Sequence, residues 1–223
     1  MKVKLISYTQ PLQPQSHDTE NTISVLQDLV CFTARVSNPS NQMNTETNEK
    51  LVKYLINNHH WSPFEMVSIC LEIETTRDIA RQILRHRSFS FQEFSQRYAV
   101  ANLGFNFREA RLQDNKNRQN SIENKNISLD DEWYEKQEEI QDIVSKTYSW
   151  ALSNGIAKEQ ARAILPEGNT MSRMYVNGTL RSWIHYIQLR SGNGTQKEHR
   201  EIALECANKI KDIFPLIKTF ISD

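Results

Sequence analysis

The 223-residue sequence is poor in cysteine. Its three cysteines, Cys31, Cys70 and Cys206, lie far apart without paired spacing, which argues against a disulfide framework and a zinc site. The pattern favours a reducing compartment, and the apolar segments around Cys70 and Cys206 predict core packing. The neighbouring His59 and His60 do not share a helix face and no third ligand has a suitable spacing, so we expect no metal.

Glycine is scarce as well, and the chain carries no net charge. With six glycines and no Gly-x-Gly-x-x-Gly after a predicted strand, the chain cannot build the phosphate-binding turn of a Rossmann fold. The 27 basic and 27 acidic residues give a formal net charge of zero, whereas proteins that bind nucleic acid backbones usually carry a basic excess. Local basic clusters therefore indicate sites for small anions.

Long apolar runs are also missing, and no signal peptide is recognisable, so we expect a cytoplasmic protein without membrane contact. The hydrophobic content of 38% is low for a monomer, which predicts that neighbouring subunits cover part of the surface. The length fits a single domain over residues 1–223, and no internal repeat or linker interrupts it.

Apolar periodicity predicts strands over residues 2–9 and 66–75, and helices over residues 22–36, 47–57, 76–85, 131–153, 158–165, 180–190 and 195–214. Residues 171–176 fit a connector or a short strand, and residues 101–131 lack a clear period and predict only partial order. Together these elements predict an α+β fold, with a small, mostly antiparallel sheet packed against several helices.

Helix ends and buried faces can be predicted for three segments. The helix that follows Thr45 or Thr47 should bury Leu51, Tyr54 and Leu55. Thr195 and Glu198 fit a capping box for the last helix. Asp130 or Asp131 should cap the long helix. Its apolar side should carry Trp133, Tyr134, Ile140, Ile143, Val144, Tyr148 and Ala151.

Residues 85–98 combine cations, hydroxyls, aromatic rings and a carboxylate in one short run. The run contains Arg85, His86, Arg87, Ser88, Phe89, Ser90, Phe91, Glu93, Phe94, Ser95, Arg97 and Tyr98. Unpaired charges cost on the order of several kcal/mol each to bury, so the run suits a core poorly. Cations beside hydroxyls and flat rings suit a ligand that is anionic at one end and flat at the other, such as a nucleotide. On residue chemistry alone, a strand-like loop with surface arginines fits equally well.

Residues 177–190 predict a second informative element, a helix with one apolar stripe and two polar faces. The stripe consists of Leu180, Trp183, Ile184 and Ile187. One polar face carries Arg181, His185 and Gln188, and the other Ser182, Tyr186 and Arg190. Such a helix is also normal at a protein surface, so its pattern alone does not assign a function.

The run at 85–98 resembles the signature of the flavin-dependent thymidylate synthases, which is Arg-His-Arg, seven residues, Ser, and then Arg-Tyr just beyond. The resemblance spans nearly the whole chain, and it is firmest over residues 59–98 and 159–206. Three positions depart from the family pattern. Gln92 stands where the family usually has Asn, Met66 where it commonly has His, and Thr179 where it often has Asn.

The resemblance implies reductive methylation of dUMP to dTMP. Methylenetetrahydrofolate would be the carbon donor, FAD the hydride carrier and NADPH the reductant, and the enzyme would use no covalent nucleophile. It also implies a homotetramer in which several subunits share each active site. The expected partners are dUMP, folate, NADPH and further copies of the chain, with no nucleic acid polymer.

The resemblance also implies site residues. Those expected to bind dUMP are Gln82, Arg85, Glu93, Ser95, Gln96, Arg97, Arg162 and Arg190. Those expected to bind FAD are His60, Ser62, Arg85, His86, Arg87, Glu93, Thr179, Arg181 and His185. Arg97 and Arg162 should hold the phosphate. Arg190 is the expected catalytic residue: its guanidinium stays protonated, so it can stabilise charge on the pyrimidine but cannot act as a base.

Two other classes of function remain open from the sequence. Residues 85–98 offer cations for phosphates and rings for stacking, as in an RNA- or single-strand-binding module. Zero net charge and the absence of a recognisable RNA-binding motif argue against that reading. The other alternative is a flavin- or nucleotide-binding regulator without catalysis. Colour separates the two classes, because a flavoprotein is yellow and an oligonucleotide-binding module is not.

Overall fold

The computed structural model describes residues 1–11 and 24–222. Within them an antiparallel sheet has the order β1 (Lys2–Tyr8), β2 (Ser68–Thr76), β6 (Met171–Thr179) and β3 (Ser90–Glu93). The two strands predicted over residues 2–9 and 66–75 are confirmed as β1 and β2, which are neighbours at one end of this order. The segment predicted as a connector or short strand is instead β6, a nine-residue strand between β2 and β3.

Alternating residues give the sheet one apolar and one polar face. Ile69, Leu71 and Ile73 of β2 are fully buried, as are Met174 and Val176 of β6. The other face is polar. There Lys4 pairs with Glu72 at 2.9 Å, the Tyr175 hydroxyl donates to Glu72 at 2.8 Å, and Arg173 pairs with Glu74. The period-2 pattern therefore decides which face the helices cover.

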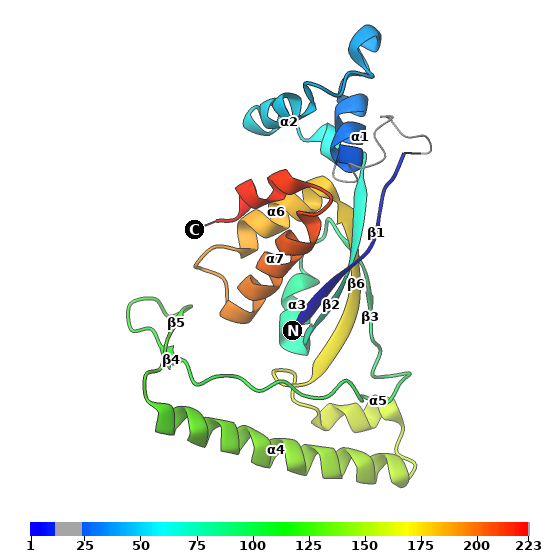
Figure 1. Cartoon of the computed structure of the whole chain (residues 1–223). Helices are drawn as coiled ribbons and strands as arrows, with labels where there is room; N and C mark the ends of the chain where they lie inside the picture. The colour runs from blue at the N-terminus through cyan, green and yellow to red at the C-terminus, as the bar shows by residue number, and fades with distance from the viewer. Residues whose placement is uncertain (12–23, 223) are drawn as a thin grey trace.

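The apolar face is covered by α3 (Arg77–Ile83), α6 (Leu180–Arg190) and α7 (Lys197–Ile210) (Figure 1). The predicted stripe of α6 is confirmed, because Leu180, Trp183, Ile184 and Ile187 are all fully buried. One of its predicted polar faces is not solvated, since Ser182 and Tyr186 are buried too. The helix predicted to run to Arg85 ends at Ile83, so Arg85 lies in the turn beyond it.

At one end of the sheet lie α1 (Ser24–Ala34), α2 (Asn48–Asn57) and the 3-10 turns η1 (Pro39–Asn41) and η2 (Ser62–Glu65), while the 3-10 turn η4 (Pro215–Phe220) packs on α6 and α7. Residues 22 and 23 of the predicted first helix lie outside the described residues. Leu55 is buried as predicted, but Tyr54 is 55% exposed, so that prediction was wrong. Arg35 and Asn48 join α1 to α2 through a 2.6 Å hydrogen bond.

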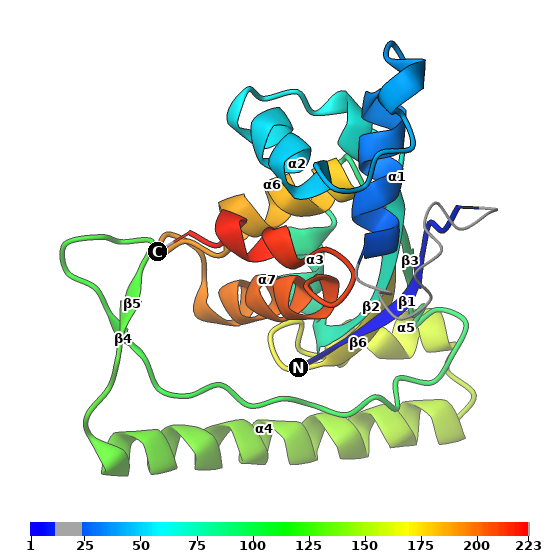
Figure 2. The same cartoon turned by 45° about the horizontal axis from the view of Figure 1, so that its top comes forward.

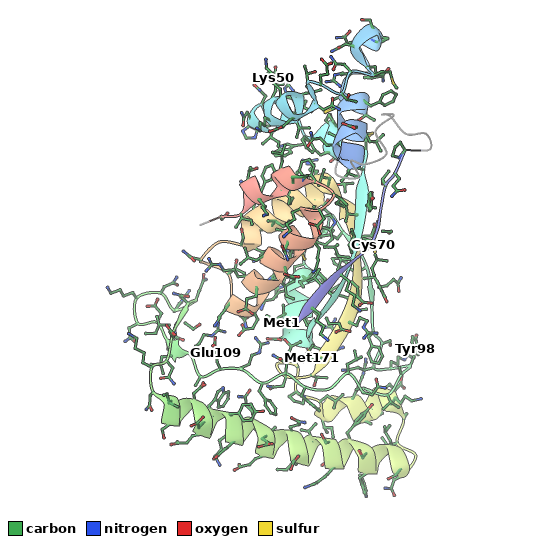
Figure 3. All side chains as sticks on the ribbon, viewed as in Figure 1. Met1, Lys50, Cys70, Tyr98, Glu109 and Met171 are labelled. Carbon is green, nitrogen blue, oxygen red and sulfur yellow. The ribbon has the colours of Figure 1, made fainter. Side chains whose placement is uncertain are left out.

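The remaining elements form an arm apart from the helices on the sheet (Figure 2). They are the long α4 (Ile127–Ser153), α5 (Lys158–Ala161), the 3-10 turn η3 (Arg162–Ile164), and a hairpin of β4 (Leu112–Gln113) and β5 (Ser121–Ile122). Residues 98–110 run beside α4, and Figure 3 shows the labelled Tyr98 and Glu109 near its opposite ends. The Ala101 N–H donates to Tyr148 at 3.1 Å, and the Ala110 N–H to Asp130 at 2.7 Å.

Two helix caps differ from the predicted ones. Asn126 caps α4 by accepting from the Leu129 N–H at 3.3 Å, while the Asp130 carboxylate is used by Ala110. At α7 the capping box does not form. Gln196 occupies the N-cap, and the Glu198 carboxylate faces Arg108 and Arg111 instead. In both cases the acidic side chain contacts a partner distant in sequence instead of capping the helix.

The predicted apolar side of α4 is only partly buried. Tyr148 and Ala151 are buried with Ala161 of α5, but Trp133, Tyr134, Ile140 and Ile143 are between 42% and 65% exposed. The prediction was therefore wrong for most of the helix within one chain. Exposed apolar rows of this extent are typical of surfaces that other proteins cover.

Gly178 in β6 makes room for the ring of Phe89. A Cβ at this position would lie 2.2 Å from Phe89 Cδ1, and the Phe89 ring packs on Trp183 with centroids 4.6 Å apart. We expect Gly178→Ala to lower the free energy of unfolding by about 1–3 kcal/mol through overpacking, measured by urea denaturation. Gly168→Ala is the control, because a Cβ there meets nothing within 4 Å. Equal midpoints for the two variants would contradict this account.

Candidate functional site

The turn between α3 and β3 holds the Arg-His-Arg motif against α6. Phe89 is buried beside Gly178, and the Ser182 hydroxyl donates to the Ser88 carbonyl at 3.2 Å. Arg85 and Arg87 are exposed, and among the described residues neither has a carboxylate within 4 Å. The turn thus presents two guanidinium groups to solvent while its aromatic residue anchors it.

A first group of side chains, the Arg190 cluster, consists of Gln82, His86, Tyr186, Arg190 and His199. Arg190 Nε donates to His86 Nε2 at 3.0 Å, and the His86 ring meets Tyr186 edge-on at 4.9 Å. Burial and the nearby Arg190 lower the pKa of His86 to about 4, so its ring is neutral and can accept this bond. The guanidinium is therefore fixed through Nε, and its two NH2 groups have no partner among the described residues.

His199 lies on the other side of this cluster. It is fully buried in α7, its Nδ1 is 3.1 Å from Gln82 Oε1, and its ring lies 5.7 Å from Tyr186. Gln82 Nε2 in turn donates to Gln196 Oε1 at 2.8 Å. The His199 Nε2 and the Tyr186 hydroxyl are buried without a hydrogen-bond partner in the described structure.

The sequence reasoning missed Tyr186 and His199 as members of this cluster, and Gln196 as a partner of its Gln82. For His199 a signal existed, because it precedes Ile202 and Cys206 on the predicted inner face of α7 by three and seven residues. Tyr186 was placed on a predicted polar face of the helix, so its burial was not expected. Gln196 carries no sequence signal of its own, since only the tertiary fold brings it to Gln82.

The buried histidines predict a stability that falls with acid. Burial and Arg190 lower the pKa of His86 to about 4 and, together with His86, that of His199 to about 3, against an ordinary value of 6.5. Below pH 6.5 the unfolded chain therefore binds protons that the folded chain does not, which favours unfolding. We expect the free energy of unfolding to drop by on the order of a few kcal/mol between pH 7.5 and 4.5. Urea midpoints across this range measure it, His199→Asn should flatten the slope, and a constant midpoint would contradict it.

A second group, the Trp61 cluster, surrounds η2 and the start of α6. The Trp61 and His185 rings meet edge-on at 5.0 Å, His60 lies 5.9 Å from Tyr54, and Arg181 pairs with Glu65. Burial and Arg181 lower the pKa of His185. Thr179 caps α6 by accepting from the Ser182 N–H at 3.2 Å, and Ser62 is exposed in η2. Of the residues expected to bind FAD, this cluster holds His60, Ser62, Thr179, Arg181 and His185.

A third group, the Glu159 cluster, joins the arginines expected at the phosphate. Arg97 Nε pairs with Glu159 at 2.7 Å, and Arg162 Nε donates to the Glu159 carbonyl at 3.3 Å. Ser95 is half-buried nearby in sequence, and Gln96 is buried with its Nε2 lacking a partner in the described residues.

Glu93 belongs to none of these groups. It lies in β3, accepts from the Ser172 hydroxyl at 2.8 Å, and pairs with Arg81 at 3.0 Å and Arg77 at 3.5 Å. Its carboxylate is thus held from three sides within the chain. A ligand that contacts Glu93 would have to share it with Arg77 and Arg81.

The Glu159 cluster and the Trp61 cluster lie at opposite ends of β6. η3 precedes the strand and α6 follows it, and nine extended residues span roughly 30 Å at about 3.4 Å each. The views in Figures 1 and 2 agree, with α5 beside α4 and away from α6. One chain therefore does not bring Arg97 and Arg162 next to Arg190.

The cysteines are unsuited to nucleophilic catalysis. Burial raises the pKa of Cys31 to about 12 and raises that of Cys206 further. Cys70 lies half-buried on the polar face of the sheet, so the prediction that it packs in the core was wrong, and burial raises its pKa as well. No described thiol is therefore a thiolate near neutral pH.

An open polar cavity of about 1080 Å³ separates the β4–β5 hairpin from the start of α7, and Gln196, Arg111, Arg118, Lys197 and Arg200 are among its lining residues.

Over the described ranges, no three His, Cys, Asp or Glu side chains are grouped to hold a metal ion. Among the helices of residues 1–11 and 24–222, none combines the length and apolarity that crossing a membrane requires.

Comparison with solved structures places this fold beside a nucleotide methylase. A UMP/dUMP methylase, PolB from Streptomyces cacaoi, crystallised with 5-Br dUMP, superposes with a TM-score of 0.81 at 22% identity, covering 98% of this chain and 93% of that one. The match defines the class of fold, an α+β architecture with a small antiparallel sheet, and confirms the predicted fold class at that level.

Sequence comparison is more specific. The family described as "Thymidylate synthase complementing protein" matches residues 21–216. A probable flavin-dependent thymidylate synthase of Paramecium bursaria Chlorella virus 1 is 46% identical over all of this chain and 96% of its own. The flavin-dependent thymidylate synthase of Synechocystis is 44% identical over 97% of each chain. The chain therefore belongs to the flavin-dependent thymidylate synthases, a family of enzymes, as its sequence predicted.

Proposed function

We propose that this chain catalyses the reductive methylation of dUMP to dTMP, with methylenetetrahydrofolate as carbon donor, FAD as hydride carrier and NADPH as reductant. The observation that carries the proposal is the fixed guanidinium of Arg190, held through Nε by the neutral His86 of the Arg-His-Arg turn. Family membership supports the reaction, and the 5-Br dUMP complex of PolB supports the nucleotide.

Arg190 would activate the pyrimidine by charge. Its two NH2 groups can donate together to a planar, electron-rich edge of the ring and stabilise negative charge that develops there. Because His86 already holds Nε, the fork needs no reorganisation when substrate binds. The neutral His86 adds no second positive charge that would have to be desolvated.

The structure supports a reaction without a covalent protein nucleophile. The thiols have raised pKa values, as described above. For Ser95, no His or carboxylate of the described residues lies within hydrogen-bonding distance of the hydroxyl, so a general base is missing. Ser95 is therefore assigned to binding the nucleotide, together with Gln82, Arg85, Glu93 and Gln96.

The residues around Trp61 and the Arg-His-Arg turn fit a flavin dinucleotide. Arg85 and Arg87 are exposed donors for a pyrophosphate, and Arg181 has a buried Nε without a partner in the described part of the chain. His60, Ser62, His86, Glu93, Thr179 and His185 would complete the contacts. When bound, the flavin supplies the hydride that completes the new methyl group.

Phosphate binding is assigned to Arg97 and Arg162, which converge on Glu159. Within one chain these two arginines lie away from Arg190. A second copy of the chain would bring its own Arg97 and Arg162 to Arg190, as expected for a homotetramer with shared sites. The exposed apolar residues of α4 give such an assembly a surface to bury.

Two measurements test the proposal on purified protein. A bound flavin gives a yellow protein whose absorbance bleaches on addition of NADPH. Release of tritium from 5-labelled dUMP, dependent on NADPH and on methylenetetrahydrofolate, reports the methylation itself. Colourless protein that retains oligonucleotide at moderate salt would overturn the proposal in favour of a nucleic-acid-binding module, and yellow protein without tritium release would favour a regulator.

A further inference from the structure

We propose that His199 is a positioning residue for the nucleotide, which acts through Gln82 at the end of a hydrogen-bond relay of fixed direction. The relay consists of Glu198, Gln196, Gln82 and His199, and it joins the start of α7 to the end of α3. This inference rests on the proposed function, because it assumes that Gln82 meets dUMP.

Glu198 sets the direction of the relay, that is, which group donates and which accepts in each hydrogen bond. Its carboxylate is buried between Arg111 at 2.6 Å and Arg108 at 2.8 Å. Burial alone would raise the pKa of Glu198, but its own backbone N–H and the two arginines hold it at about 2. An ionised carboxylate only accepts hydrogen bonds, so the Gln196 amide must turn its Nε2 toward Glu198, at 2.9 Å.

The remaining groups follow in order. Gln196 Oε1 then faces Gln82 and accepts from its Nε2 at 2.8 Å. Gln82 Oε1 is left facing His199 Nδ1 at 3.1 Å, and an amide oxygen cannot donate, so Nδ1 carries the proton. The fully buried His199 holds that single proton, because a second one would place an unpartnered N–H at its buried Nε2.

The relay thereby fixes which end of the Gln82 amide meets a ligand. Turning the amide over would set Gln82 Oε1 against Gln196 Oε1 and Gln82 Nε2 against the His199 N–H. Moving the His199 proton to Nε2 would restore only the second bond, at the cost of a buried N–H without a partner. In the observed orientation one hydrogen of Nε2 remains unused within the relay. Gln82 therefore presents a donor, suited to an acceptor oxygen of the nucleotide, and its partner Gln196, 2.8 Å away, lines the polar cavity.

The test is a double-mutant cycle on the dissociation constant for dUMP, measured by titration calorimetry on the full-length protein. We expect His199→Leu to weaken dUMP binding about 10-fold, because it removes the hydrogen bond to Gln82 and with it the fixed orientation of the Gln82 amide. His199→Asn, whose amide nitrogen replaces Nδ1, should stay within about threefold of wild type. In a Gln82→Leu background, His199→Leu should add no further loss, because the relay has no amide left to orient.

Gln196→Ala keeps the inference testable if the buried variants do not fold, because Gln196 is exposed and its removal frees the same amide. It should weaken dUMP binding severalfold, whereas Gln141→Ala on α4 should not. Binding as tight as wild type in both His199→Leu and Gln196→Ala would overturn the inference, as would an equal loss with and without Gln82. Wild-type protein without affinity for dUMP would overturn the proposed function first, and that result is seen before any variant is made.

Discussion

Replacing Arg190 by lysine is expected to lower the rate of dTMP formation by about 10²- to 10³-fold, the usual effect of removing one preorganised donor from a transition state. Lysine keeps a positive charge, but it has neither the Nε that His86 holds at 3.0 Å nor the planar pair of NH2 groups. The ammonium would be free to move, so it could not present two parallel donors to the pyrimidine. Single-turnover formation of dTMP from dUMP on flavin-loaded protein measures the effect.

A matched control for this substitution is Arg200→Lys. Arg200 is also half-buried, and its Nε donates to the Ser191 carbonyl at 2.8 Å, close to the end of α6. It should lose similar local contacts without the loss in rate. Because Arg190 lies at the C-terminus of α6 rather than in the core, its replacement should leave the unfolding midpoint nearly unchanged. Near wild-type turnover in Arg190→Lys would show that the guanidinium fork does not activate the ring.

Much of the fold could be predicted because its signals are local. The alternation in β2 and the stripe Leu180, Trp183, Ile184 and Ile187 each place apolar residues on one face, and the structure buries them. The family signature pointed to the Arg-His-Arg motif and to site residues on α6, and those roles stay predictions. What the signature could not show is that His86 accepts from Arg190, since this bond joins residues 104 positions apart.

Predictions failed where tertiary partners compete for a side chain. Asp130 and Glu198 have the residue type of helix caps, but Ala110 and the arginines of residues 108–111 take their carboxylates. Trp133 and Ile143 have the spacing of a core face, but α4 lies on an arm whose main partner within the chain is an extended segment. A single sequence contains no local signal for either outcome, because both depend on which segments meet.

Arg108→Met is expected to lower the free energy of unfolding by about 3–5 kcal/mol, as for the loss of one partner from a buried charge network. Arg108 is 16% exposed and pairs with Asp78 at 2.9 Å and with Glu198 at 2.8 Å, the second contact being too bent for a hydrogen bond. It also donates to the Gly168 carbonyl at 3.2 Å. Methionine fills a similar volume, so the effect reports charge rather than a cavity.

The same substitution should loosen the arm as well as weaken the fold. Arg108 joins the segment beside α4 both to the first turn of α3, through Asp78, and to the first turn of α7, through Glu198. Urea denaturation measures the loss, and hydrogen exchange of residues 105–111 should rise before that of the sheet. Lys136→Met on α4 is the control, because its pair with Glu139 at 2.8 Å is exposed and should contribute little to stability. If both variants unfold at the same urea concentration, the network around Glu198 does not hold the arm, and the direction of the relay would have to be set by something other than a fixed carboxylate.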